Sequence, residues 1–230
     1  MNGAKLWDAN LTGANLAGAD LAKADLKKSL LIKANLSNAN LHHSFLFKAN
    51  LTDANLERAN LIDANLYKSF FYVANLSNAD LSFANLSDSN LMGANLKQTN
   101  LKMAFLNDAD LTGANLEGAN LPDANLTGVD LTGANLYGAN LTLVDLMEAN
   151  LTKADLTGAN LFGVNLTGAN LAGVNLFYAN LTKVSLEASD LTDVYLTGAV
   201  TKDAIITKSQ WDNLSKLYSS EFMKQFIVMR

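Results

Sequence analysis

A leucine recurs at every fifth position of this chain, and that spacing limits what the chain can fold into. From Leu6 to Leu196 there are 39 such positions in one unbroken register, and only Phe71 among them is not leucine. A period of five matches neither the 3.6-residue period of an α-helix nor the two-residue alternation of a long strand. Each unit is therefore expected to be a short extended segment followed by a corner, and stacked units predict a solenoid.

The residues around each leucine follow a pattern that separates inside from outside. The residue two places before the leucine is Ala, Ser, Thr or Val at all 39 positions, and the residue between them is Asn or Asp at 32. Because side chains alternate along an extended segment, the leucine and the small residue point inward and the Asn or Asp points outward. All 14 glycines lie two places after the leucine register, where a type II turn needs positive φ. Other residues stand at many corners, which leaves either a different turn or a small strain there.

The unit of a small residue, Asn or Asp, then Leu or Phe and two variable positions resembles the pentapeptide repeat family over about residues 4 to 200. The resemblance implies an all-β solenoid, a right-handed quadrilateral β-helix with four pentapeptide units in each coil. The serines Ser29 and Ser69 fit a spacing of 20, but Leu30 and Phe45 fit a spacing of 15. With four units per coil, the chain makes about ten coils and a rod roughly 45 to 50 Å long.

The repeat ends near residue 200, which predicts a β-helix over 1–200 and a C-terminal α-helical cap or dimerisation segment over 201–230. Ser209 followed by Asp212 is a variant of the capping box and predicts the start of a helix. Apolar residues at helical spacing would then cover the last coil and block edge-to-edge pairing. The cap is the favoured interpretation, and the alternative is a homodimer contact formed by apolar residues outside this stripe, among them Met223 and Val228. The candidate cap or dimer contact consists of Trp211, Leu214, Leu217, Tyr218, Phe222, Phe226 and Ile227.

A coil of four units would gather lysines with aromatic and aliphatic side chains in the first half of the chain. Lys28, Lys48 and Lys68 would stack on one face, with Phe47 beside Tyr67. Exposed patches of this type often mark interaction sites, whereas ladders of like residues can equally stabilise a solenoid by stacking. The candidate partner patch consists of Lys28, Lys48, Lys68, Leu30, Ile32, Phe45, Phe47, Tyr67, Phe70 and Tyr72.

The second half of the repeat is strongly acidic. Residues 103–200 carry two Lys or Arg against eleven Asp or Glu, whereas residues 1–102 carry ten against eight. The family that the chain resembles includes acidic DNA mimics that bind DNA gyrase and confer fluoroquinolone resistance, so the resemblance implies gyrase as an alternative partner. Carboxylates also raise solubility without any partner. The candidate acidic mimic surface consists of Asp108, Asp110, Glu117, Asp130, Asp145, Glu148, Asp155 and Asp190.

Neither catalytic motifs nor cofactor motifs stand out in the chain. There is no cysteine for a disulfide or a thiolate site. The two histidines, His42 and His43, are assigned to a solvated corner, because two adjacent imidazoles cannot form a metal site alone. Phosphate-binding glycine loops, catalytic triads and calcium loops are absent from the sequence. These observations favour a protein that is not an enzyme and needs no cofactor.

The sequence therefore favours a non-catalytic structural or protein-interaction scaffold with an unknown protein partner. The alternative is a DNA mimic that modulates gyrase. Without a bilayer-length apolar run or a signal segment, a cytoplasmic protein is expected. Neither direct binding to nucleic acid nor membrane association is expected.

Overall fold

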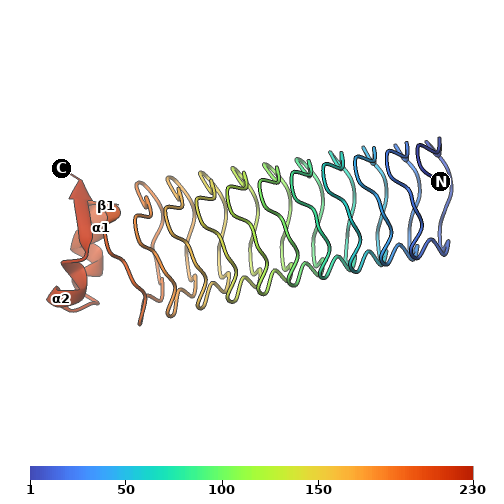
Figure 1. The fold of residues 1–230 in the computed structure, drawn as a ribbon. Helices are drawn as coiled ribbons and strands as arrows, with labels where there is room; N and C mark the ends of the chain where they lie inside the picture. The colour runs from blue at the N-terminus through green and yellow to red at the C-terminus, as the bar shows by residue number, and fades with distance from the viewer. Residues whose placement is uncertain (230) are drawn as a thin grey trace.

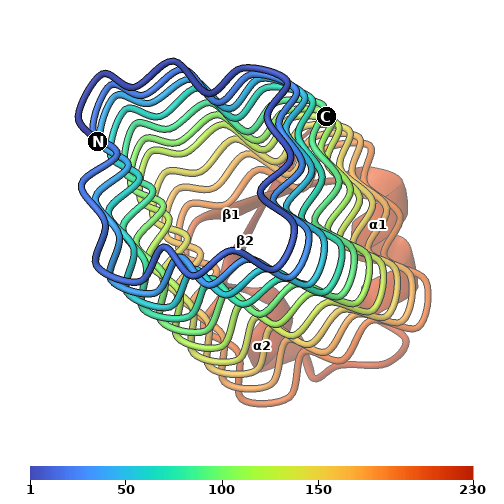
Figure 2. The same ribbon diagram turned by 90° about the vertical axis from the view of Figure 1, so that its right-hand side faces the viewer.

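The computed structural model of the protein describes residues 1–229, which form a rod with a separate C-terminal segment at one end (Figure 1). Parallel β-bridges join residues that are 20 positions apart, from Lys5 with Asp25 to Ser185 with Ile205. Four pentapeptides therefore complete one coil, and the rod is four-sided when viewed along its axis (Figure 2). The alternative spacing of 15 is wrong, because Leu30 is bridged to Asn10 and Asn50.

The faces and columns of the rod follow from this spacing. Residues 4–8, 9–13, 14–18 and 19–23 begin faces 1 to 4, and each face continues one coil later with the residues that are bridged to them. We call residues at the same place in successive coils a column and name it after its first member, so that column 8 contains Lys28, Lys48 and Lys68. Columns 3, 8, 13 and 18 are the four corners, and column 8 is the corner between faces 1 and 2.

The interior is filled by the leucines and the small residues that precede them. Leucines from Leu21 to Leu166 are fully buried, and so is Phe71. Most hydroxyl groups at small positions find backbone partners, as Ser29 Oγ donates to the Leu26 carbonyl at 2.7 Å and Thr99 Oγ1 to the Leu76 carbonyl at 2.9 Å. The buried Ser44 hydroxyl is an exception, because it has no partner among the described residues. Large and small side chains thus form one continuous buried core along the tube, which leaves the outer surface for binding.

Every corner between residues 3 and 203 has one residue in the left-handed backbone conformation. All 14 glycines and 27 other residues at these corners have φ between 49° and 73°. The N–H of the next residue donates to the carbonyl of the leucine, as Ala34 does to Leu31 at 3.0 Å. This is the pattern of a type II turn. The open question about non-glycine corners is thereby answered, because they keep the glycine turn and accept its strain.

The C-terminal segment contains strand β1 (Ala204–Thr207), helix α1 (Lys208–Leu214), helix α2 (Ser220–Met223) and strand β2 (Phe226–Met229). Strand β2 pairs in parallel with β1, which is itself bridged to face 1. Within residues 1–229, neither helix has the length and apolar character needed to cross a bilayer.

Two details of the predicted C-terminal helix are wrong. Helix α1 is capped by Thr207, whose side chain and that of Gln210 form a reciprocal capping box, so Ser209 and Asp212 do not begin the helix. The apolar stripe also does not lie on one helix, because Phe226 belongs to β2. Pairing with β1 offers the backbone of this part hydrogen bonds that helical spacing in the sequence does not reveal.

Side chains of the C-terminal segment replace the backbone of a further coil. Gln210 Nε2 donates to the carbonyls of Leu186 and Ser189 at 2.6 and 2.9 Å. The Tyr218 hydroxyl lies 3.1 Å from both the Val194 carbonyl and the Leu196 N–H. In the rest of the rod, the groups equivalent to the Ser189 and Val194 carbonyls and to the Leu196 N–H bond to the next coil, whereas the Leu186 carbonyl already accepts the Ser189 N–H within its own turn. The segment therefore satisfies polar groups at this end that would otherwise lack partners.

The first coil is covered less completely. Leu6, Leu11 and Leu16 are only partly buried, and Trp7 is 61% exposed. Neither Trp7 nor residues 1–5 therefore shield the leucines of this coil.

Val73 gives a test of corner strain, because it is the β-branched residue among the corners of residues 1–229 and has φ of 49°. Asn tolerates the left-handed region, so Val73→Asn should raise the free energy of unfolding by about 1 kcal/mol. The matched control is Gly133→Val, since a Cβ at Gly133 would meet nothing within 4 Å. It should lower stability through strain alone. Urea denaturation measures both, and unchanged midpoints would contradict a shared strained turn.

Candidate functional site

The lysines of the candidate partner patch form a ridge along one corner of the rod. Lys28, Lys48 and Lys68 lie in successive coils of column 8, with φ of 56° or 57°, and all three are exposed. The backbone of each ridge lysine is hydrogen-bonded to the coil that follows, as Lys28 N–H is to the Phe47 carbonyl at 2.9 Å. The corner turn fixes where each side chain leaves the rod. We call Lys28, Lys48 and Lys68 the basic ridge.

Aromatic rings on face 1 support the basic ridge. The rings of Phe47 and Tyr67 stack with their centroids 5.8 Å apart. Lys48 Nζ lies 5.2 Å from the Phe47 centroid, and Lys68 Nζ lies 5.1 Å from that of Tyr67, distances at which a cation is attracted to the ring face. Interaction with the Tyr67 side chain raises the pKa of Lys68 above its usual value. Aromatic rings of adjacent coils therefore stack on face 1, as expected if this part of the patch stabilises the solenoid.

Apolar side chains on face 2 form the other flank of the ridge. Leu30 and Phe70 are 40% and 48% exposed in column 10, where Asn50 separates them, and Tyr72 is 50% exposed in column 12. Ile32, also in column 12, is partly buried. Phe45, on face 1, is 43% exposed and lies 5.1 Å from Lys27 Nζ. We call Leu30, Phe70 and Tyr72 the apolar flank, and unlike the Phe47 and Tyr67 pair, it leaves much of its surface open.

The outward asparagines make two hydrogen bonds that the residues of the apolar flank cannot make. Asn35 Oδ1 accepts the N–H of Ser37 at 3.1 Å, and Asn35 Nδ2 donates to Asn15 Oδ1 in the preceding coil at 3.3 Å. The first contact supports the corner, and the second links adjacent coils. Leu30 and Phe70 occupy equivalent outward positions but can make neither contact. Their presence therefore lacks an explanation in local stability.

Five of the eight candidate acidic residues lie on one edge of the rod. Asp108 and Glu148 belong to column 8, and Asp110, Asp130 and Asp190 belong to column 10 on face 2. We call these five residues the acidic edge. The other three are elsewhere: Asp145 on face 1, and Glu117 and Asp155 on face 3.

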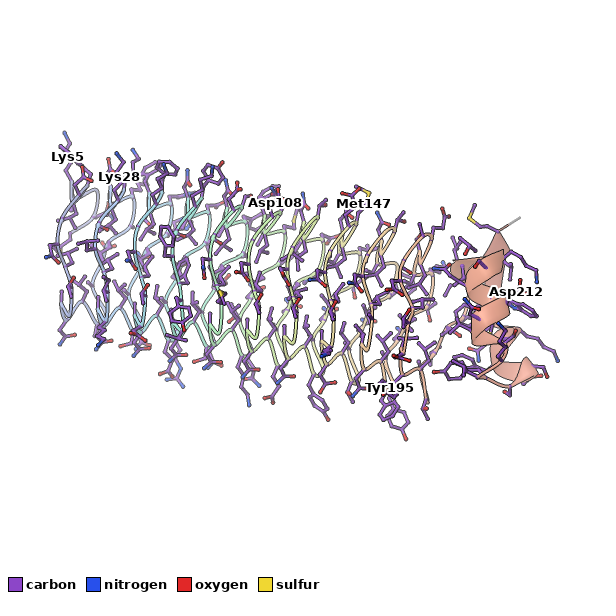
Figure 3. The ribbon with its side chains drawn as sticks, turned by 180° about the vertical axis from the view of Figure 1, so that it is seen from behind. Lys5, Lys28, Asp108, Met147, Tyr195 and Asp212 are labelled. Atoms are coloured by element: carbon purple, nitrogen blue, oxygen red, sulfur yellow. The ribbon has the colours of Figure 1, made fainter. Side chains whose placement is uncertain are left out.

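The acidic edge and the basic ridge share one corner. Figure 3 shows Lys28 and Asp108 along the same edge of the rod. Column 8 changes sign after Lys68, since Asp88 and Asp108 occupy the next two coils. Charge counts over long segments did not show this reversal, although reading every twentieth residue would have found it. The structure thus places the basic ridge and five of the eight predicted acidic residues along one edge.

Hydrogen bonds to the following corner hold the three column 10 carboxylates of the acidic edge in place. Asp130 Oδ1 accepts from Thr132 N–H and Oγ1 at 2.8 and 2.6 Å. Asp190 has the same contacts with Thr192, at 2.9 and 2.6 Å, and they lower the pKa of Asp190. Asp110 and Asp130 lie in adjacent coils of one column, and neither ionised carboxylate can donate to the other.

The candidate cap or dimer residues divide into buried and exposed groups. Leu214 and Phe226 are buried, and Trp211, Tyr218 and Phe222 pack partly against the core. Leu217 and Ile227 are 74% and 49% exposed. The assignment of Met223 to a dimer contact is wrong, because its side chain is only 3% exposed and packs inward.

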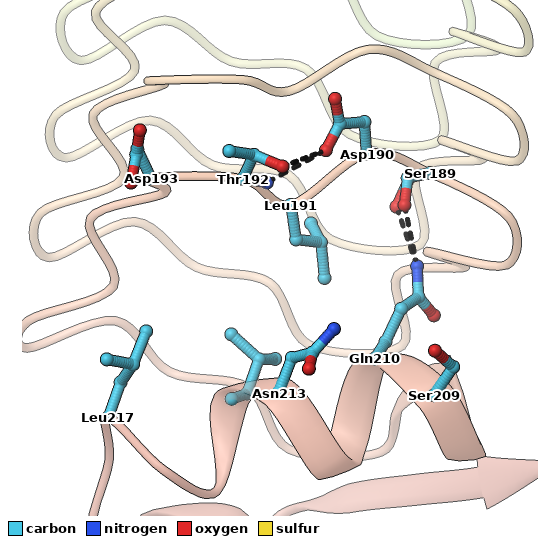
Figure 4. Close-up of a pocket in the computed structure, with 10 residues that line it drawn as sticks. Ser189, Asp190, Leu191, Thr192, Asp193, Ser209, Gln210, Asn213 and Leu217 are labelled. Carbon is cyan, nitrogen blue, oxygen red and sulfur yellow. Dashed lines mark hydrogen bonds between the residues drawn. The ribbon is translucent and has the colours of Figure 1, made fainter.

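A pocket between the last repeats and α1 shows no chemistry of its own (Figure 4). Its polar groups already bond to one another: Asp190 accepts from Thr192, and Ser189 Oγ contacts Gln210 Nε2 at 3.2 Å. Ser189 Oγ has no histidine or lysine base beside it among its contacts within residues 1–229, and the lysine contact of the lining is that of Asn213 Oδ1, which accepts from Lys216 Nζ at 3.3 Å. The arrangement fits a junction that holds the C-terminal segment.

Comparison with known proteins shows which family has this repeat. A family model described as "Pentapeptide repeats" matches in eight copies, over residues 1–31, 34–71, 54–93, 74–113, 89–128, 109–146, 130–168 and 169–200. Among curated proteins, no sequence matches the chain.

Several solved structures resemble the chain. HetL from the cyanobacterium Nostoc sp. strain PCC 7120, a pentapeptide repeat protein involved in heterocyst differentiation regulation, is 33% identical over 87% of this chain and 90% of its own, with a TM-score of 0.40. Rfr23 from the cyanobacterium Cyanothece 51142 is 44% identical over 37% of this chain and 58% of its own, with a TM-score of 0.37. QnrB1, a plasmid-mediated fluoroquinolone resistance protein, is 22% identical over 93% and 97%, with a TM-score of 0.49.

Because Asp110 and Asp130 are stacked in adjacent coils, we expect their repulsion to lower the free energy of unfolding. Asp130→Asn should raise the free energy of unfolding by about 1 kcal/mol, because the new amide can donate to Asp110 and a like-charge pair disappears. Asp145→Asn is the control, since Asp145 is stacked between Asn125 and Asn165 and loses no such repulsion. Thermal and urea denaturation should rank Asp130→Asn above Asp145→Asn, most clearly at low salt. The reverse order would contradict repulsion within column 10.

Proposed function

Because the chain belongs to the pentapeptide repeat family, with its right-handed β-helical solenoid, we propose that it is a non-catalytic scaffold that binds a protein partner. The binding surface is the basic ridge with its apolar flank. A rod of about ten four-sided coils, with residues 201–230 as its C-terminal cap, holds this surface rigid. Rigidity favours binding, because few side chains lose freedom when the partner docks.

The apolar flank carries the proposal. Leu30, Phe70 and Tyr72 expose 40% to 50% of their surface at outward positions where the repeat otherwise gains hydrogen bonds from Asn or Thr. Aromatic residues beside cations are enriched in the energetic centres of protein interfaces. Column 8 supplies the lysines, so a partner with an acidic rim around an apolar centre has the matching chemistry.

The test returns the flank to the repeat pattern. Leu30→Asn with Phe70→Asn restores the residue found at Asn50 and Asn90 in the same column, so the rod should fold unchanged. Proximity labelling in cells of the source organism, followed by reconstitution with the purified partner, should show binding weakened by at least about tenfold.

The matched control removes exposed aromatic residues elsewhere. Phe177→Thr with Tyr195→Asn removes two exposed rings on face 3, whose centroids are 6.3 Å apart. Binding should survive this change. If both double variants lose the same protein, or neither does, the flank is not the binding surface.

The acidic edge favours a second candidate, a DNA mimic that modulates gyrase. Five carboxylates on one edge, including Asp110 and Asp130 in adjacent coils, form a negative strip on a narrow rod. The acidic DNA mimics within the pentapeptide repeat family motivate the choice of enzyme. The spread of Glu117, Asp145 and Asp155 to other faces supports the scaffold instead.

Gyrase supercoiling with purified protein titrated in separates the two candidates. A DNA mimic should inhibit supercoiling or protect gyrase from a quinolone, and Asp110→Asn with Asp130→Asn should remove the effect. Asp20→Asn with Asp80→Asn, which neutralises two carboxylates on face 4, should leave it intact. Unchanged supercoiling at all protein concentrations would exclude the gyrase function and leave the scaffold.

We also propose that the protein is cytoplasmic and that it forms a homodimer through its C-terminal segment. The exposure of Leu217 and Ile227 supports the dimer, which light scattering of the purified protein would detect.

A further inference from the structure

We propose that His42, His43 and Asp63 form a binding site for a divalent transition metal ion such as Zn²⁺. The chain contains only two histidines, and the sequence shows them only as neighbours. The four-unit coil brings Asp63 to the same corner column as His43, one coil later. One donor atom from each of the three side chains lies within 4.8 Å of the other two.

Hydrogen bonding leaves His42 ready to coordinate. His42 Nδ1 lies 3.0 Å from the Ile62 carbonyl, and because a carbonyl can only accept, Nδ1 carries the proton. In the neutral ring, Nε2 then has the free lone pair. Histidine ligands commonly donate their other ring N–H to a backbone carbonyl, which fixes both tautomer and orientation. His42 therefore already has the contact that a metal-binding imidazole requires.

His43 and Asp63 supply the second and third donors. His43 Nδ1 lies 3.8 Å from Asp63 Oδ2, with 47% and 43% of the two side chains exposed. The His42 and His43 rings have centroids 3.8 Å apart. Both His43 and Asp63 occupy corners with φ of 55°, so the backbone positions them firmly while their side chains can rotate.

Coordination chemistry favours a transition metal over Mg²⁺ or Ca²⁺. Imidazole nitrogen suits Zn²⁺, Cu²⁺ and Ni²⁺, whereas the alkaline-earth ions prefer all-oxygen sites. Bond lengths of about 2.0 to 2.2 Å bring ligands in a tetrahedron to about 3.3 Å apart. Rotation of half-exposed side chains can close the remaining distance. Three protein ligands leave the fourth position to water.

Calorimetric titration of untagged, chelator-treated protein with ZnCl₂ tests the site. One Zn²⁺ should bind per chain, and MgCl₂ should give no binding at this cluster. His42→Ala, His43→Asn and Asp63→Asn should each weaken Zn²⁺ binding by at least about tenfold. Asn is chosen at the two corners because it tolerates positive φ. Asp53→Asn, at another corner with φ of 57°, should bind Zn²⁺ as the unchanged protein does.

Histidine ring signals in ¹⁵N NMR give a second measurement on the unaltered chain. His42 and His43 are the only histidines, so all imidazole signals come from these two rings. Zinc should shift the ring nitrogen signals of both. The proposal is overturned if micromolar Zn²⁺ shifts neither ring, or if His42→Ala and Asp63→Asn keep full affinity. This measurement decides the matter even where a variant fails to fold.

Discussion

The whole rod depends on one backbone constraint: the residue two places after each leucine-register position has left-handed φ. It turns the chain through a corner within four residues, so that the next five can run along the next face. Forty-one corners share it, and 27 of them are not glycine. An L-residue in this region costs about 1 to 2 kcal/mol in isolation. The strain persists because each corner N–H from Gly3 to Lys183 is also bonded to the next coil, as Lys33 N–H is to the Thr52 carbonyl at 2.9 Å.

Uniform corners separate the tasks of the inner and outer residues. Leucine and small side chains satisfy the interior, and the backbone ladder satisfies nearly every polar group between coils. Outward positions are then free to vary, provided the ladder survives. Asn is favoured there because it bonds both to its own corner and to the preceding coil, as Asn75 does with Ser77 and Asn55. A departure such as Phe70 gives up both hydrogen bonds, which is the reason for placing it in the proposed binding surface.

Charge and apolar surface are organised along a single edge. Column 8 carries Lys28, Lys48 and Lys68 in one half of the rod and Asp88 and Asp108 in the next coils. The apolar flank lies beside the basic part on face 2. A partner that follows this edge meets opposite charges along its length, which would fix the direction in which it binds. The proposed metal site lies at a different corner, column 3, so it can act independently of this edge.

Much of this protein can be predicted from its sequence, because the repeat is local. The leucine period determined the solenoid, the buried positions and the place of each corner, since every unit folds in the same way. The Lys28 to Tyr72 patch followed once four units per coil were adopted. The sequence left three and four units per coil open, however, and only the bridges of Leu30 to Asn10 and Asn50 decided between them.

Tertiary structure alone decided what depends on contacts between distant residues. The single predicted helix became α1, α2 and β2, because β2 finds hydrogen bonds on β1. Met223 turned inward, Asp63 came to the two histidines, and both charged surfaces met at one corner. Each outcome depends on which residues lie one coil apart or at the end of the rod. A five-residue pattern is the same at every corner, so it cannot by itself say which corners coincide.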